Sequence, residues 1–342
     1  MAILPSELEA IDAQISAQLD LLRHEKDVSA QIIRLIEKMR KELIAKLSEG
    51  NLTEFGKQRV NNLIKSATET IDDYYSKAQD VLFTTLEGTA SVTAKSTIAG
   101  LPEAITATIP SATVLETLVS NLLIEGAPSA AWWKRQSQDT AFKFANAVRQ
   151  GIVQGDTNEQ IFKRVGEVTD LAGRNSRSLI HTSIMQAASS AREKTIEANK
   201  DIYKGFRHLS TLDGHTTPIC IARSNLEWNF DHEPIGHNLP WNPPPVHWGC
   251  RSVLAPIRKT FKELGIDLEE PKGRTRASAE GQIDRDTSFD EFLKRRTKAQ
   301  QDEQLGVGRA ELWRSGVITL RQLLDNEGNT LTLEELKAKY NG

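Results

Sequence analysis

Residues 208–220 read HLSTLDGHTTPIC, and residues 231–252 read DHEPIGHNLPWNPPPVHWGCRS. Between His208 and Cys250 lie both cysteines, five of the seven histidines and three of the six tryptophans of this 342-residue chain. Thiols and imidazoles are metal ligands, whereas prolines fix rigid turns. This composition predicts a compact, irregular segment from His208 to Cys250, which we call the knot.

Short strands are expected on both sides of the knot. The sequence GFRHLSTL, which begins at Gly205, alternates in the manner of a half-buried strand. The sequence RSVLAPI, which follows Cys250, is a second strand candidate. The two segments predict a small β element that supports the knot.

Residues 1–88 have the apolar spacing of long helices. Apolar residues recur every three or four positions, but a polar gap at residues 24–27 is compatible with a kink, a stutter or two separate helices. A second periodic segment covers about residues 53–86, and Gly88 is expected to end it. The pattern predicts a long helical hairpin whose apolar stripes form a bundle seam or a surface for another protein.

The remainder of the chain also shows mainly helical patterns. Helices are expected from about Trp132 to Gly155, in a short segment capped by Thr157, and from Ser176 to about residue 200. We therefore expect a mainly α protein with a small β element, in the α+β class. The expected parts are an N-terminal hairpin (1–88), a charge-poor linker or packing segment (89–131), a central α+β domain (132–257) and a helical tail (258–342).

Composition limits the classes of function. The chain has 43 basic and 46 acidic residues, so its net charge of −3 does not indicate general binding to nucleic acid or anionic membranes. A run of 18 apolar residues is lacking, so we expect no membrane-spanning helix and no membrane partner. Two cysteines do not form a disulfide framework, and the first residues do not read as a secretory signal. Synthesis in a reducing cytoplasm is expected.

Cys220, His247 and Cys250 are the candidate metal ligands. The His-x-x-Cys spacing lets two ligands approach one ion from a single turn, and a structural zinc would need one more ligand. The candidates for that position are His215, His232 and His237. Two alternatives stay open: the cysteines pack as small apolar residues while His247 bonds a loop carbonyl, or the cysteines form a disulfide.

Catalytic patterns are weak, so we assign no catalytic residue and no cofactor-binding residue and expect no enzyme. The chain lacks a P-loop, a dinucleotide glycine fingerprint and a G-x-S-x-G elbow. A Cys220 nucleophile with His247 as base lacks a third orienting group.

An HNH-like nuclease with a metal bound at His232 and His247 is one alternative function. The prolines between residues 240 and 245 disfavour it, because such a finger carries its last ligand on a helix. A nucleic-acid-binding module is the other alternative, in which tryptophan and arginine planes would stack on bases. Its candidate residues are Trp228, Trp241, Trp248, Arg223 and Arg251.

The knot carries motifs that resemble the Mu F-like head morphogenesis family, the minor head proteins of tailed phages. The resemblance covers about residues 132–257. The matching segments are GIVQG (151–155), STLDGHTTPIC (210–220), PIGHNLPW (234–241) and PPVHWGCRS (244–252). Many members have a cysteine pair ahead of the His-x-x-Cys motif, which would complete a zinc set. Thr217 stands at the first position of that pair here, so only Cys220, His247 and Cys250 carry over as ligands of one structural zinc.

The resemblance implies a structural protein of the virion, located in the capsid interior at the portal vertex and made in the host bacterial cytoplasm. The implied partners are the portal protein and other internal head proteins, with several copies around the portal and contact with packaged DNA. The implied role is assistance in head assembly and in DNA packaging or delivery.

Overall fold

The structure is a computed structural model that describes residues 5–99, 101, 105–267, 275–278, 281–284 and 287–340. It confirms a mainly α protein with small antiparallel sheets. The chain forms two compact units: unit 1 comprises residues 1–22, 89–118 and 185–342, and unit 2 comprises residues 23–88 and 119–184. The domain boundaries expected from the sequence stay predictions.

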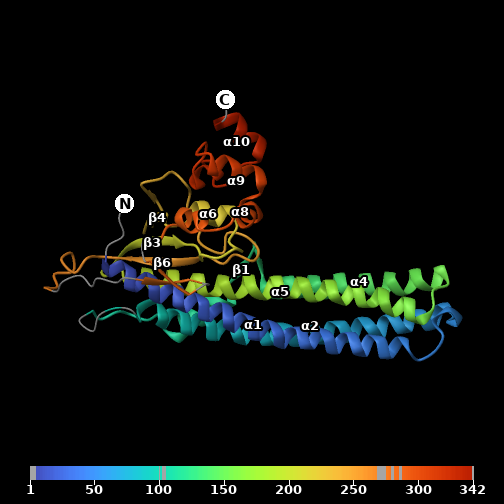
Figure 1. The fold of residues 1–342 in the computed structure, drawn as a ribbon. Coiled ribbons are helices and arrows are strands. Elements are labelled where there is room, and N and C mark those ends of the chain that lie inside the picture. Colours follow the sequence, from blue (N-terminus) through green and yellow to red (C-terminus); the bar gives the residue numbers. More distant parts are fainter. Residues whose placement is uncertain are drawn as a thin grey trace. The chain divides into compact units, whose positions relative to one another are not determined.

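Unit 2 is a bundle formed by parts of four long helices (Figure 1). These helices are α1 (Pro5–Leu47), α2 (Lys57–Ile98), α4 (Ser129–Gln154) and α5 (Asn158–Glu197). Short elements complete the connections: η1 (Leu52–Glu54), β1 (Leu123–Ile124) and β2 (Ala127–Pro128) in unit 2, and α3 (Ala112–Ser120), most of which belongs to unit 1. The apolar stripes of the helices form the core of the bundle, as the hairpin prediction requires. Its fully buried members include Met39, Leu43, Ile71, Leu82, Phe144, Val148, Ile161 and Val165.

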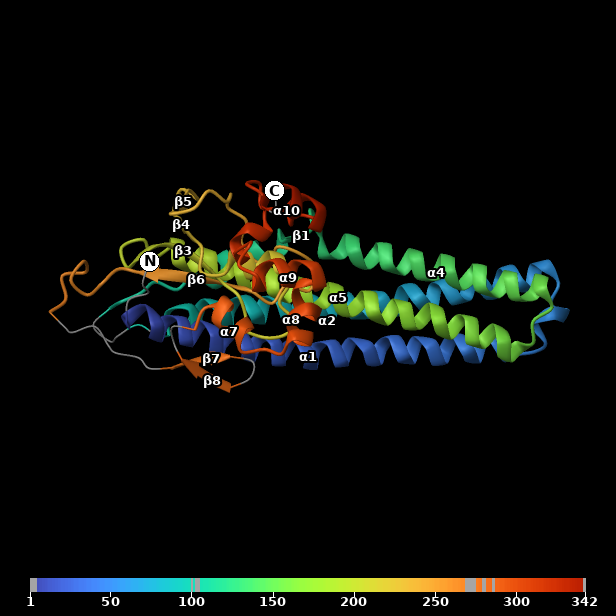
Figure 2. The same ribbon diagram turned by 45° about the horizontal axis from the view of Figure 1, so that its top comes forward.

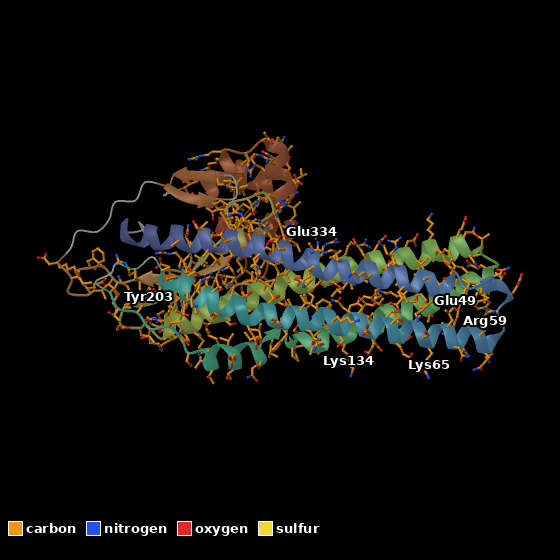
Figure 3. All side chains as sticks on the ribbon, turned by 90° about the horizontal axis from the view of Figure 1, so that it is seen from below. Glu49, Arg59, Lys65, Lys134, Tyr203 and Glu334 are labelled. Carbon is orange, nitrogen blue, oxygen red and sulfur yellow. The ribbon has the colours of Figure 1, made fainter. Side chains whose placement is uncertain are left out.

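Polar contacts fix the helix pairs of unit 2. The Tyr75 hydroxyl lies 2.9 Å from Thr140 Oγ1, which joins α2 to α4. Arg40 on α1 pairs with Asp170 on α5 at 2.9 Å. Lys65 and Lys134 instead project outward from α2 and α4 (Figure 3). The bundle therefore has an apolar seam and a charged exterior, as expected for helices with one buried stripe.

Two helix boundaries expected from the sequence are wrong, and the structure decides a third point that the sequence left open. The polar gap at residues 24–27 lies within the continuous helix α1, so the alternative of two separate helices is wrong; the gap has no proline, and its Glu and Lys are good helix formers. Gly88 does not end α2, which continues to Ile98, since one exposed glycine costs a helix only about 1 kcal/mol. The segments expected after Thr157 and Ser176 are one helix, α5.

Unit 1 contains the β element that the sequence predicted on both sides of the knot. Its main sheet has the order β5-β4-β3-β6, and every neighbouring pair is antiparallel. The strands are β3 (Tyr203–Leu209), β4 (Glu227–Asn229), β5 (Pro234–Ile235) and β6 (Val253–Arg258). On one side of the sheet, Leu209, Val253 and Ala255 pack against Ile15 of α1. The strands β7 (Thr275–Ser278) and β8 (Gly281–Asp284) form a separate hairpin.

The C-terminal helices of unit 1 pack against the knot rather than forming an isolated tail. They are α7 (Phe289–Lys294), α8 (Lys298–Leu305), α9 (Val307–Arg314), η2 (Leu320–Leu323) and α10 (Leu333–Tyr340), and α8 and α9 lie side by side (Figure 2). One apolar cluster contains Leu212, Ile221 and Trp228 from the knot together with Leu293 and Leu323 from these helices. Within the described residues, no helix is both long enough and apolar enough to cross a membrane.

Candidate metal centre

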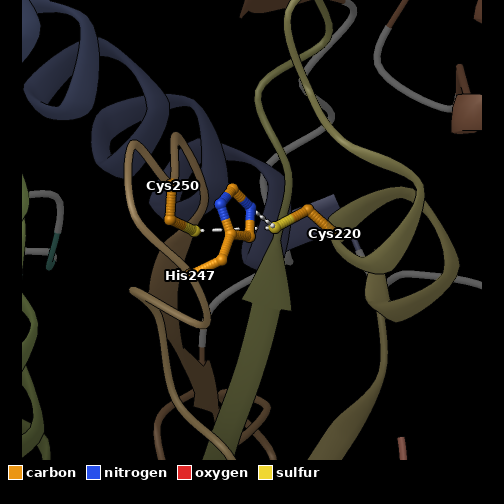
Figure 4. Close-up of side chains that lie close together, drawn as sticks. All are labelled: Cys220, His247 and Cys250. Carbon is orange, nitrogen blue, oxygen red and sulfur yellow. Dashed lines mark hydrogen bonds between the residues drawn. The ribbon is translucent and has the colours of Figure 1, made fainter. Parts of the chain in front are cut away.

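Two short elements bring the predicted ligands together. Cys220 lies on α6 (Pro218–Arg223), a helix with Thr217 as N-cap and proline at its first position, where a missing N–H costs nothing. His247 and Cys250 lie on the segment before β6, in a turn closed by the Cys250 amide donating to the His247 carbonyl at 3.2 Å. The ligand atoms of all three residues lie within 4.8 Å of one another (Figure 4). The structure thus brings together the three residues predicted from the sequence.

A backbone carbonyl fixes the tautomer of His247. Its Nδ1 lies 2.8 Å from the carbonyl oxygen of Trp248, which can only accept a hydrogen bond, so Nδ1 carries the proton. The lone pair of Nε2 then faces the Sγ of Cys220 at 3.2 Å. A histidine whose second nitrogen donates to a carbonyl is the usual arrangement in metal sites. Nε2 is therefore oriented as a ligand atom.

The two thiols share a hydrogen bond. The sulfurs of Cys220 and Cys250 lie 3.5 Å apart, well beyond the length of about 2.05 Å for a disulfide bond, so the disulfide alternative is wrong for this structure. Donation from Cys220 lowers the pKa of Cys250 well below its ordinary value, and the same bond together with burial raises the pKa of Cys220. Two cysteine sulfurs beside an imidazole nitrogen suit a soft or borderline cation.

Asp213 braces the two halves of the knot. One carboxylate oxygen accepts hydrogen bonds from the amides of His215 and Thr216 at 2.8 and 2.9 Å. The other oxygen pairs with Arg251 Nε at 2.6 Å. The Asp213 side chain is 5% exposed, so this pair joins the LDG motif to the CRS motif inside the fold. The sequence marked both motifs but gave no signal that they pair.

His208 adds a buried imidazole next to this network. Both of its ring nitrogens are buried and lack a hydrogen-bond partner among the described residues. Burial lowers the pKa of His208 to about 4, so its ring is neutral at pH 7. His208 was not among the predicted ligands, and it is not in the group formed by Cys220, His247 and Cys250.

The three histidines expected to supply a further ligand lie elsewhere, and that expectation is wrong. His215 is outside the metal-ligand group, and His237 Nε2 lies 2.8 Å from the carbonyl oxygen of Glu227. His232 lies beside Glu193 and stacks on Trp241. The residue that meets His247 instead is Thr217, whose Oγ1 lies 2.8 Å from Nε2.

The positions of the histidines, tryptophans and arginines in the knot argue against the two alternative functions. His232 and His247 belong to different clusters, so they do not form one nuclease finger, and no helix spans residues 240–245. Trp228 is 1% exposed and donates to the Leu239 carbonyl at 3.1 Å, which makes it a core residue rather than a stacking platform. Arg223 is also buried, and Arg251 is paired with Asp213.

A known protein family matches the knot and the helices that precede it. Residues 142–255 match the family described as Phage Mu protein F like protein. This segment is Mu F-like. It begins on α4, ends on β6 and contains Cys220, His247 and Cys250. The family resemblance read from the motifs is thereby confirmed. No curated protein and no solved structure matches the chain.

Proposed function

We propose that this chain is a minor head protein of a tailed phage, which binds the portal and other internal head proteins during head assembly. The observation that carries the proposal is the Mu F-like segment, residues 142–255, with the Asp213–Arg251 brace inside it. The chain is made in the bacterial cytoplasm, enters the capsid interior at the portal vertex in several copies and assists DNA packaging or delivery. Its role is structural and not enzymatic.

The outer face of α4 is a candidate contact with the portal. Phe142 and Val153 are 68% and 86% exposed. They lie about three turns apart, so they share one side of the helix. Exposed aromatic side chains are enriched at protein interfaces. This face therefore offers apolar contact area on a largely charged surface.

Co-purification from infected cells tests the proposal. The wild-type chain is expected in purified heads and procapsids and in a complex with the portal. Phe142→Glu is expected to reduce portal recovery at least fivefold, whereas Lys143→Glu, an exposed neighbour that gains the same side chain, leaves it unchanged. Absence of the wild-type chain from heads and procapsids would overturn the assignment.

Contact with packaged DNA is a separate part of the proposal. Basic side chains that neutralise DNA phosphates release counterions, so such binding weakens steeply as the salt concentration rises. We expect weak DNA binding that depends on salt and no cleavage of DNA in the presence of a divalent metal. Metal-dependent cleavage that disappears in both His232→Ala and His247→Ala would favour the nuclease instead.

The three-residue cluster in the knot is proposed to hold one structural zinc ion. Two thiols and a correctly oriented imidazole nitrogen fit Zn²⁺, with one position left for another donor. Elemental analysis of the purified protein is expected to give about one zinc per chain, and Cys250→Ser is expected to lose it. A folded wild-type protein that contains no zinc would show instead that these three residues only pack in the core.

A further inference from the structure

A second cluster of side chains that can bind a metal ion lies apart from Cys220 and Cys250. Glu193 and Glu197 are one turn apart near the end of α5, so their carboxylates lie on the same face of the helix. His232 reaches them from the turn between β4 and β5. One ligand atom from each of the three residues lies within 4.8 Å of the others. All three belong to unit 1.

The imidazole is held in place and its inner nitrogen is free for a ligand. The His232 ring stacks on Trp241 with centroids 4.4 Å apart and an interplanar angle of 7°. Its Nε2 is buried from solvent, makes no hydrogen bond among the described residues and lies 3.6 Å from Glu193 Oε1. Two ligand atoms that each lie about 2.1 Å from one ion are at most about 4.2 Å apart. The 3.6 Å between His232 Nε2 and Glu193 Oε1 therefore allows both atoms to bind the same ion.

The surroundings of the Glu193 carboxylate favour a cation as a further partner. Glu193 is largely buried, and burial together with the neighbouring Glu197 raises its pKa to about 7. Lys194 pairs with Glu197 at 2.8 Å, and its charge offsets only part of the rise in the pKa of Glu193. A cation between the two carboxylates would remove their mutual repulsion.

We propose that Glu193, Glu197 and His232 bind one divalent first-row transition ion, which ties the end of α5 to the β4–β5 turn. Two carboxylates and one imidazole form a harder donor set than the two thiols in the knot, and they leave positions for water. Mn²⁺ is therefore the discriminating probe, because it prefers oxygen ligands over thiolates.

Titration of the full chain with Mn²⁺, followed by the electron paramagnetic resonance signal of the free ion, tests this site. One saturable Mn²⁺ per chain is expected, and it should raise the melting temperature. Glu197→Gln and His232→Gln are each expected to weaken binding at least tenfold. The matched control is Glu167→Gln, an exposed glutamate on the same helix, which should bind as the wild type does.

The remaining variants separate this site from the knot. The double variant Cys220→Ser, Cys250→Ser should retain Mn²⁺ binding, and Lys194→Ala should tighten it by freeing Glu197. If His232→Gln fails to fold by circular dichroism, Glu197→Gln, whose side chain is 30% exposed, decides the question. Absence of saturable binding, or equal affinity in Glu197→Gln and the wild type, overturns the proposal.

Discussion

Thr217 is the residue that separates this knot from a four-ligand zinc site. Its hydroxyl lies 2.8 Å from His247 Nε2, three residues ahead of Cys220. Because Nε2 carries a lone pair, the hydroxyl donates to it and so competes with a metal ion for that pair. A hydroxyl is also a much weaker zinc ligand than a thiolate. In the proposed zinc site, Thr217 therefore supplies a hydroxyl where a further thiolate would complete the ligand set.

Thr217→Cys is expected to increase the affinity for Zn²⁺ at least tenfold. The new thiolate would complete a Cys₃His set, which is typical of structural zinc sites. Competition against a chromophoric zinc chelator measures the change, with Thr217→Ser as the control that keeps the hydroxyl. Equal affinities of the Cys and Ser variants would mean that Thr217 does not lie at the ligand position.

Asp213 is the residue that we expect to matter most for the stability of the knot. Asp213→Asn removes the charge that pairs with Arg251 and places an amide beside the guanidinium in a buried setting. Breaking one partner of a buried ion pair costs about 3–5 kcal/mol, and the 24% exposure of Arg251 reduces that cost. We expect a loss of about 2–3 kcal/mol in the free energy of unfolding by urea. Asp201→Asn, at an exposed position, should change it by less than about 0.5 kcal/mol.

Among the elements, β3 depends on a glycine at its contact with β4. A Cβ added to Gly205 would lie 2.2 Å from the Trp228 carbonyl oxygen and 3.0 Å from the Asn229 Cα. Both obstacles are backbone atoms, so side-chain rotation cannot relieve the clash. Gly205→Ala is expected to cost at least about 2 kcal/mol in urea unfolding.

Gly214→Ala is the matched control for this substitution. It adds the same methyl group within the knot, where nothing lies within 4 Å of the new Cβ. Its stability should stay within about 0.5 kcal/mol of the wild type. Similar losses in the two variants would show that the β3–β4 contact is not the cause.

The elements differ in how far the sequence could predict them. Apolar periodicity predicts α1 and α2 and their hairpin because buried stripes follow the helical repeat. The continuity of α5 is less visible, since Gly166 and Gly173 lie within it. A Cβ at Gly166 would lie 2.7 Å from Arg40 Nη2, so glycine there leaves room for the guanidinium group of Arg40. Local sequence patterns cannot report such a tertiary reason for a glycine.

The residues of the candidate site also differ in how far the sequence could predict them. The grouping of Cys220, His247 and Cys250 could be predicted because thiols and imidazoles gather in one short segment and the His-x-x-Cys spacing fits a single turn. The pairing of Asp213 with Arg251, and of Glu193 with His232, could not, because each pair joins residues almost 40 positions apart. Such contacts depend on the sheet order, which the sequence leaves open.

At the scale of the whole molecule, the knot depends on residues outside the Mu F-like segment. The match ends at residue 255, yet the apolar cluster beneath the knot includes C-terminal residues such as Leu293 and Leu323. Gln304 of α8 also donates to the carbonyls of Asp213 and Thr216 at 2.8 and 3.0 Å. The C-terminal helices therefore complete the core that supports the proposed metal ligands.

Leu293→Ala tests this dependence far from the knot in sequence. Leu293 is fully buried, and removing such a leucine costs about 2–5 kcal/mol in the free energy of unfolding. Because one cluster joins α7 to Ile221 and Trp228, we expect the amides of α6 and β4 to exchange hydrogen faster together with those of the C-terminal helices. Val307→Ala, at a residue that is 66% exposed, should leave exchange in the knot unchanged. Faster exchange confined to the C-terminal helices would show that the knot is stable without them.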